Sequence, residues 1–224
     1  IPEAGGLGTS ASAIVGGLAA ANYYLDEPLS KDDLLALATE IEGHPDNVAP
    51  AIFGGLIGVV KSDEKEVAKP NSVQLNYLKI PFPTELRVVV AVPELRVPTA
   101  EARKLLPKEV PFGEAVFNLS HTGLLVGACF AGRLDLFGRA MADALHQNRR
   151  SVLIPGFHEV VARAYQQGAV GVALSGSGPT IIAFTSHAKQ DSVGEGMVSA
   201  FTEKGVKAQW LSVAVNQDGF RLIR

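Results

Sequence analysis

Cysteine is nearly absent from this 224-residue sequence, which has only Cys129. A single cysteine excludes an intrachain disulfide and a cysteine-rich metal centre. It also favours a reducing compartment, so we expect a cytoplasmic protein. The sequence shows no initiator methionine and no targeting pattern, and a glycine-rich run follows its first residues at once. Because such a run normally follows a strand, we expect the chain to be a fragment of a longer protein.

An excess of charge of one sign is missing as well. The 20 Lys and Arg nearly balance the 23 Asp and Glu, for a net charge of −3, which argues against nonspecific nucleic-acid binding. Two uncharged stretches, 4–25 and 164–188, exceed the ~18 residues that a membrane span needs. Glycines interrupt both, and Pro179 also interrupts the second. With 47% hydrophobic residues, we expect a folded core and no membrane partner.

The hydrophobic pattern predicts an α+β protein with a domain boundary near Pro81–Pro83, which separates residues 1–82 from 83–224. A buried, alanine-rich helix is predicted over 11–24, and a capped helix begins at Ser30. Further helices are predicted over 99–106, 111–131, 134–145, 157–167 and 188–203, and a polar loop over 61–69. Strands are predicted over 56–60, 73–80, 86–92, 170–175, 180–185, 208–215 and 219–223. The second part therefore indicates an antiparallel sheet with helices on one face, a ferredoxin-like sandwich.

The strongest local signal is a glycine-rich loop ahead of the first helix. Its backbone N–H groups and the helix N-terminus can bind a phosphate, and its hydroxyls can contact a phosphate or Mg²⁺. It is not a Walker A loop, and it only approaches the Rossmann pattern, because Asp26 ends a helix rather than a second strand. A glycine-rich helix start with a packing role is the alternative. The candidate residues are Pro2, Glu3, Ala4, Gly5, Gly6, Leu7, Gly8, Thr9, Ser10, Ala11 and Ser12.

A second glycine turn, Leu174–Thr180, lies between two apolar strands and contains Gly176 and Ser177. Its glycines are typical of a tight hairpin. The alternative is a second group of backbone donors that supports the first loop or faces a substrate.

An acidic turn follows the second predicted helix and contains Glu40, Glu42, His44, Asp46 and Asn47. Mg²⁺ bound with a nucleotide takes one or two carboxylates, so Glu40 and Ser10 are candidate ligands. Asp46 and Asn47 suit a substrate amine or hydroxyl. The alternative is structural, with Asp46 or Asn47 capping the next helix and the glutamates facing water.

Three arginines are the remaining candidates, namely Arg103 and the pair Arg149 and Arg150. Arginine suits bidentate carboxylate binding. The alternative for each of them is solvation at the surface.

Taken together, these segments resemble the GHMP kinases. The Pro2–Ser12 loop is similar to the second motif of that superfamily and the Leu174–Thr180 turn to its third. The run His44-Pro45-Asp46-Asn47-Val48-Ala49-Pro50 is similar to the homoserine kinase branch, as are Val97–Arg103, Phe117–Ser120 and Leu153–Gly156. The resemblance implies a ribosomal-protein-S5-like N-terminal domain, incomplete here, followed by a ferredoxin-like domain. It also implies phosphorylation of the L-homoserine hydroxyl by Mg²⁺-ATP on the route to threonine, in a cytoplasmic homodimer.

The resemblance assigns a role to each candidate. Ser10 and Glu40 match the metal-binding pair, with Glu42 as the alternative to Glu40. His44, Asp46, Asn47, Gly176 and Ser177 match the substrate side, and Arg103 and Arg150 match the arginines that bind the substrate carboxylate, with Arg149 as the alternative to Arg150. Asp46 is either the ammonium ligand, which we favour, or a catalytic base. Other functional possibilities are a mevalonate-type kinase, an inactive fragment and a dinucleotide-binding module.

Overall fold

The computed structural model describes residues 5–61 and 75–223, and its residues group into two compact units. One unit contains residues 5–7 and Pro83–Ala214, and the other contains Gly8–Phe82 and residues 215–223. The domain division at residues 82 and 83 stays a prediction. The loop predicted over 61–69 falls almost entirely outside the described residues.

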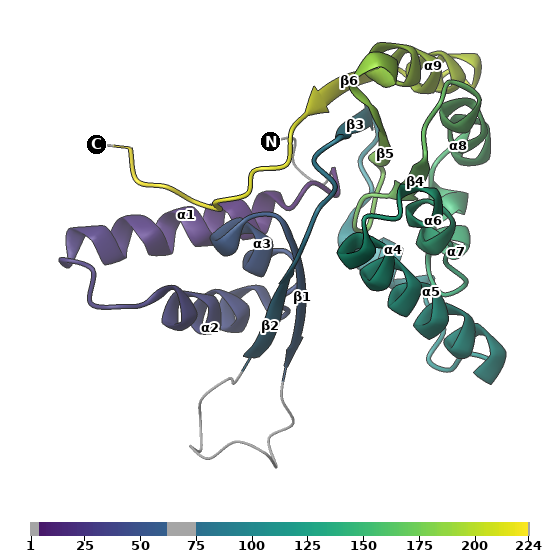
Figure 1. Ribbon diagram of the computed structural model, residues 1–224. Helices are drawn as coiled ribbons and strands as arrows, with labels where there is room; N and C mark the ends of the chain where they lie inside the picture. Colours follow the sequence, from purple (N-terminus) through teal and green to yellow (C-terminus); the bar gives the residue numbers. More distant parts are fainter. Residues whose placement is uncertain (1–4, 62–74, 224) are drawn as a thin grey trace. The chain divides into compact units, whose positions relative to one another are not determined.

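The unit that begins at Gly8 combines three helices with a two-stranded antiparallel sheet (Figure 1). The helices are α1 (Thr9–Tyr24), α2 (Lys31–Glu42) and α3 (Val48–Phe53), and the strands are β1 (Leu56–Lys61) and β2 (Leu75–Ile80). Ser30 caps α2 as predicted, because its hydroxyl accepts the Asp33 N–H while the Asp33 carboxylate accepts the Ser30 N–H. Helix α3 was expected only in the structural alternative, in which Asp46 or Asn47 caps it, since its six residues include a proline that is typical of a helix break. Proline is nevertheless accepted in a first helical turn, where its missing N–H would be unpaired.

The core of this unit lies between the three helices and the C-terminal segment. Ala11 and Val15 of α1 pack with Leu35 and Ala38 of α2 and with Phe220. The opposite side of α1, which includes Gly16, Gly17 and Ala20, is exposed among the described residues. The prediction of a buried helix therefore holds for one face of α1 only, because a run of small apolar residues indicates low polarity and does not say how many faces are covered.

Residues 215–223 complete this unit without forming a strand. The Gly55 N–H donates to Asn216 O and the Phe220 N–H donates to Ala51 O. The strand predicted over 219–223 was therefore wrong, since the segment forms isolated hydrogen bonds with the α3 end instead of a ladder.

The other unit is built on a four-stranded antiparallel sheet with the order β4-β5-β3-β6. Its strands are β3 (Leu86–Pro93), β4 (Gly171–Leu174), β5 (Ile181–Ser186) and β6 (Ala208–Val213), and its helices are α4 (Thr99–Lys104), α5 (Phe112–Ala131), α6 (Leu134–Phe137), α7 (Gln147–Arg150), α8 (Phe157–Gln166) and α9 (Gln190–Glu203). The first and third of its strands pair in the middle of the sheet, which is the ferredoxin-like order that was predicted.

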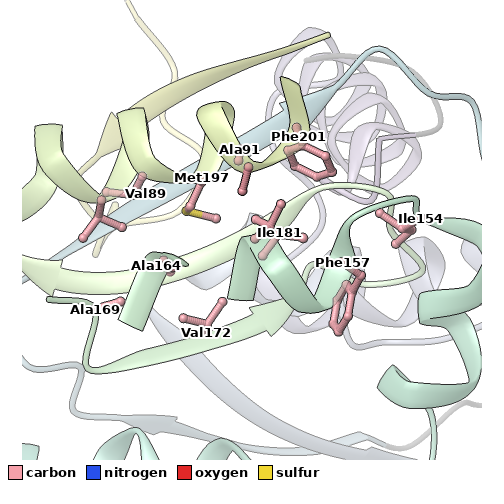
Figure 2. Close-up of a cluster of buried hydrophobic side chains, with 14 of the residues drawn as sticks. Val89, Ala91, Ile154, Phe157, Ala164, Ala169, Val172, Ile181, Met197 and Phe201 are labelled. Atoms are coloured by element: carbon pink, nitrogen blue, oxygen red, sulfur yellow. The ribbon is translucent and has the colours of Figure 1, made fainter. Parts of the chain in front are cut away.

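Helices α8 and α9 cover one face of this sheet. Figure 2 shows Ala164 and Met197 from these helices beside Val89 and Ile181 from the strands. Burying each of the larger ones, Val89, Ile181 and Met197, stabilises the fold by about 1.5–3 kcal/mol. The other face is covered too, because Val88 and Val90 are buried. The prediction of helices on one face only was therefore wrong.

Helix α6 contributes to the cover of that second face and also departs from the prediction. Phe137 packs edge to face on Phe184 of β5, with ring centroids 5.2 Å apart. The predicted helix over 134–145 ends at Phe137 and gives way to a 3-10 turn at Arg139–Met141. Gly138 keeps a helical backbone and packs too closely on Val170 O to accept a Cβ, and the chain turns extended at Ala142 (ψ 139°).

Candidate active site

The glycine-rich loop leads directly into α1. Gly8 has a left-handed conformation (φ 69°), and within the described ranges no side chain makes a capping hydrogen bond to the α1 N-terminus. The first turn of α1 also contains no acidic residue. An uncapped helix N-terminus of positive potential is suited to bind an anion. Of the predicted loop, Pro2, Glu3 and Ala4 lie outside the described residues.

The second glycine turn holds the start of the loop in place. Ser175 Oγ donates to Gly6 O at 2.7 Å, and the Thr180 N–H donates to Gly5 O at 3.3 Å. Gly6 has a φ of +75°, and a Cβ at this position would lie 2.2 Å from Ser175 O. Only glycine fits there. The turn therefore supports the loop, which was one of its two predicted roles.

Ser10 and Glu42 lie together at one end of the α1–α2 pair. Ser10 Oγ donates to Glu42 Oε2 at 2.6 Å. Glu42 follows the buried residues Ala38 and Thr39 on the same side of α2, because residues three and four apart share a helix face. Glu40 is about 200° away around the helix and is exposed. The structure thus brings Glu42, and not Glu40, to Ser10.

These oxygens fit a magnesium ion by their chemistry. A carboxylate and a hydroxyl are hard donors of the kind that Mg²⁺ takes alongside phosphate oxygens and water. No group of three or more metal-ligating His, Cys, Asp or Glu side chains occurs in the described part of the chain. A metal here would accordingly rely on phosphate oxygens for further ligands.

The turn between α2 and α3 presents a carboxylate with two neighbours. His44 Nδ1 lies 2.5 Å from Asp46 Oδ1, and Asn47 Nδ2 donates to the same oxygen at 3.5 Å. Asp46 is largely exposed, and Asn47 makes no side-chain capping bond to α3. The capping role considered for Asn47 was therefore wrong, and its amide stays available next to Gly8, whose Cβ position is 3.7 Å from Asn47 Oδ1.

The arginines belong to the unit with the four-stranded sheet, and two of them lie close together. Burial lowers the pKa of Arg150, and the guanidinium of Arg103 lowers this pKa further. Arg150 Nη1 donates to Gly176 O at 3.0 Å, while its buried Nε has no partner among the described residues. Two adjacent cations with an unused donor are suited to bind an anionic group.

Arg149 has a different environment. Its Nη1 donates to Ala144 O and Leu145 O, and its Nη2 donates to Glu114 Oε2 at 2.7 Å. This side chain is occupied by contacts within its own unit. Of the two arginines that the sequence left open, Arg150 is therefore the one that can bind a ligand.

Some site contacts were not predicted. The sequence assigned no separate role to Ser175, whose hydroxyl binds Gly6 O, although the Ser-Gly-Ser-Gly pattern puts a hydroxyl beside each glycine. Ser177 was predicted on the substrate side, but its contact with Thr99 was not: Thr99 Oγ1 lies 3.3 Å from Ser177 Oγ. The sequence separation of 78 residues hid that contact.

The family comparisons agree with this geometry. The family model for the GHMP kinases N terminal domain matches residues 1–55, and the model for the GHMP kinases C terminal matches residues 125–203. A homoserine kinase of Halothermothrix orenii is 44% identical over 99% of this chain and 68% of its own length. The chain belongs to the homoserine kinase family of the GHMP kinases. The resemblance inferred from the sequence motifs is confirmed.

Further similarities support the family and the fold. A homoserine kinase of Carboxydothermus hydrogenoformans is 49% identical over 93% of this chain and 65% of its own length. The crystal structure of homoserine kinase from Cytophaga hutchinsonii matches 98% of this chain and 69% of its own, with 34% identity and a TM-score of 0.88. The chain thus spans about two thirds of the length of these relatives. The predicted GHMP kinase fold is confirmed, and no helix in the described ranges has the length and apolar character that a membrane crossing requires.

Proposed function

We propose that the protein containing this chain transfers the γ-phosphoryl group of ATP to the side-chain hydroxyl of L-homoserine and forms O-phospho-L-homoserine. The contact between Ser10 and Glu42 carries this proposal, because a hydroxyl and a carboxylate, which are donors of the kind that Mg²⁺ takes, meet near the N-terminus of the helix that follows the glycine-rich loop. The names of the relatives support homoserine as the substrate.

Charge neutralisation and positioning are the main requirements of phosphoryl transfer. Backbone N–H groups of the loop and the α1 N-terminus bind the phosphate oxygens. Ser10 and Glu42 hold Mg²⁺, and we prefer Glu42 to Glu40 as the metal ligand because of its contact with Ser10. The bound ion would neutralise the charge that develops on the phosphate oxygens.

The substrate ligands follow from the two remaining groups of side chains. Arg103 and Arg150 bind the carboxylate of homoserine, since both are cationic and lie close enough to perturb each other. Asp46 binds the ammonium group and Asn47 orients the hydroxyl. Asp46 already accepts hydrogen bonds from His44 and Asn47, which orient its carboxylate, and a carboxylate that pairs with an ammonium group cannot easily take the hydroxyl proton at the same time. Ammonium binding is therefore favoured over proton abstraction. Gly176 and Ser177 stay on the substrate side in this proposal, because Gly176 O accepts a hydrogen bond from the guanidinium of Arg150.

The activity test is a coupled assay of ADP release by the full-length natural protein with Mg²⁺, ATP and L-homoserine. Turnover of L-homoserine, with mevalonate turned over at least about 100-fold more slowly, supports the proposal, since mevalonate has no ammonium for Asp46. Preferred turnover of mevalonate or no phosphorylation of homoserine would refute it. The homodimer and the cytoplasmic location expected from the family stay predictions.

A further inference from the structure

The segment 143–150, which carries Arg150, is held by one buried carboxylate. This is the carboxylate of Asp143, whose side chain is 7% exposed. Its Oδ2 accepts the N–H groups of His146 at 2.8 Å and Gln147 at 2.7 Å. Its Oδ1 accepts the Leu145 N–H at 3.2 Å. Three consecutive backbone donors therefore converge on this side chain. They fix the turn from which α7 begins.

A side chain of α5 anchors the same carboxylate. Asn118 Nδ2 donates to Asp143 Oδ1 at 2.7 Å, and Asn118 Oδ1 accepts the Ala144 N–H at 2.9 Å. Burial alone would raise the pKa of Asp143, but the hydrogen bonds from Asn118, Gln147 and His146 outweigh it and the pKa is lowered. The carboxylate is thus held as an anion at neutral pH, with its oxygens occupied by protein donors.

The first and last residues of α7 contact the second glycine turn. Gln147 Oε1 accepts the Leu174 N–H at 2.7 Å, and Arg150 Nη1 donates to Gly176 O at 3.0 Å. Helix α7 has only four residues, too few to be stable by its own hydrogen bonds. The placement of Arg150 consequently depends on contacts outside the helix, and those of Asp143 are the most numerous among the ones described.

Between Asp143 and Arg150 lies the imidazole of His146. Its Nε2 is 3.8 Å from Asp143 Oδ1, and its Nδ1 is 3.4 Å from Arg150 Nη1. Burial lowers the pKa of His146, so the ring is neutral at pH 7 and does not repel the guanidinium. Asp143 makes no hydrogen bond to Arg150 in the described structure, and its negative charge raises the pKa of Arg150. Removing that charge alone would strengthen the attraction of Arg150 for an anion, so weaker binding of a carboxylate in an Asp143 variant reports the placement of Arg150 by the segment.

We propose that Asp143 is a positioning residue for substrate recognition, which sets the placement of Arg150 and so the affinity for the carboxylate of the substrate. This inference rests on the proposed function of Arg150. It predicts a loss that depends on whether the substrate has a carboxylate. A general structural role would impair every substrate alike.

The test compares two substrates on the full-length natural protein and its Asp143→Asn variant. L-homoserine carries the carboxylate, and 3-aminopropan-1-ol is the same molecule without it. We expect kcat/KM for L-homoserine to fall about tenfold, mainly through KM, as is common when a supporting hydrogen-bond partner is changed. We expect kcat/KM for 3-aminopropan-1-ol to change less than about twofold, because this substrate makes no use of the carboxylate site.

Two further variants complete the design. Asp135→Asn is the matched control, since it removes an exposed carboxylate of the same unit that pairs with Arg133, and it should leave both values unchanged. If Asp143→Asn does not fold, Asn118→Ser carries the same comparison, because it removes the side-chain donor and keeps the carboxylate. Equal losses on both substrates would overturn this inference alone. Wild-type protein that does not phosphorylate L-homoserine would refute the proposed function, and the inference with it.

Discussion

Replacing Glu42 with glutamine tests the assignment of the metal site. The change keeps the size of the side chain and an oxygen that can accept the 2.6 Å hydrogen bond from Ser10. It removes the negative charge that a magnesium ion needs. Glu40→Gln is a matched control two residues away on the exposed side of the same helix. The pair of variants differs mainly in where the charge is removed.

The expected effect of Glu42→Gln is a fall in kcat of about 100-fold, which is typical when one group that stabilises transition-state charge is lost. This corresponds to about 2.7 kcal/mol of transition-state stabilisation. The Mg²⁺ concentration for half-maximal rate should rise as well, since a neutral amide is a poorer ligand for this ion. Glu40→Gln should remain within about twofold of the wild type, because its side chain is exposed and on another face of α2.

The assay is a steady-state titration of Mg²⁺ at fixed ATP and L-homoserine, with circular dichroism to confirm that each variant is folded. A large loss in Glu40→Gln together with normal activity in Glu42→Gln would refute the reasoning. Similar losses in both variants would refute it too, since the helix geometry separates the two carboxylates.

Other predictions concern the arginines, the loop and acid stability. Arg150→Lys should raise KM for L-homoserine about tenfold, because lysine cannot bind a carboxylate bidentately. Arg149→Lys should lower Tm in a thermal melt and leave KM nearly unchanged. A raised KM in Arg149→Lys with a normal KM in Arg150→Lys would contradict the assignment. Ser175→Ala removes the hydrogen bond to Gly6 O, worth about 1 kcal/mol, so KM for ATP should rise about fivefold. An unchanged KM would show that this hydrogen bond does not fix the conformation of the glycine-rich loop. Gly6→Ala should abolish nucleotide binding measured by calorimetry, since a Cβ would clash with backbone. Folding lowers the pKa of Asp143 below its ordinary 3.8, so its contribution to stability is complete above that pH and is lost as the pH falls further. The free energy of unfolding of Asp143→Asn should therefore depend less on pH below about 4 than that of the wild type. Equal slopes of unfolding free energy against pH in the two proteins would contradict this.

Local patterns predicted most helices and strands, because their signals lie within one segment. The Ser30 capping box and the β3 run of valines are examples. The ferredoxin-like strand order followed from the succession of these elements along the chain. The early end of the predicted helix could not be predicted, since Gly138 packs against Val170, which lies just before β4 and is distant in the sequence. Tertiary packing overrides local propensity at such positions.

The site was predictable by residue type and less so by pairing. The sequence offered both Glu40 and Glu42, and only the packing of α2 on its buried side selects Glu42. The choice between Arg149 and Arg150 likewise depends on Glu114, which lies 35 residues away along the chain. Asp143 was missed because it lay inside a predicted helix, where its carboxylate would have faced solvent.

The place of residues 215–223 has a consequence for biosynthesis. Backbone groups of Ala51 and Gly55 find their partners in Phe220 and Asn216, so the unit built mostly from Gly8–Phe82 needs residues that follow the whole ferredoxin-like unit in the chain. A ribosome makes about 5–20 residues per second from the N-terminus. The helices that carry Ser10 and Glu42 are therefore made before that unit, but they cannot complete their packing until the ribosome has passed Phe220. A folding chaperone that acts on nascent chains would meet this segment in an unfinished state throughout synthesis of the ferredoxin-like unit.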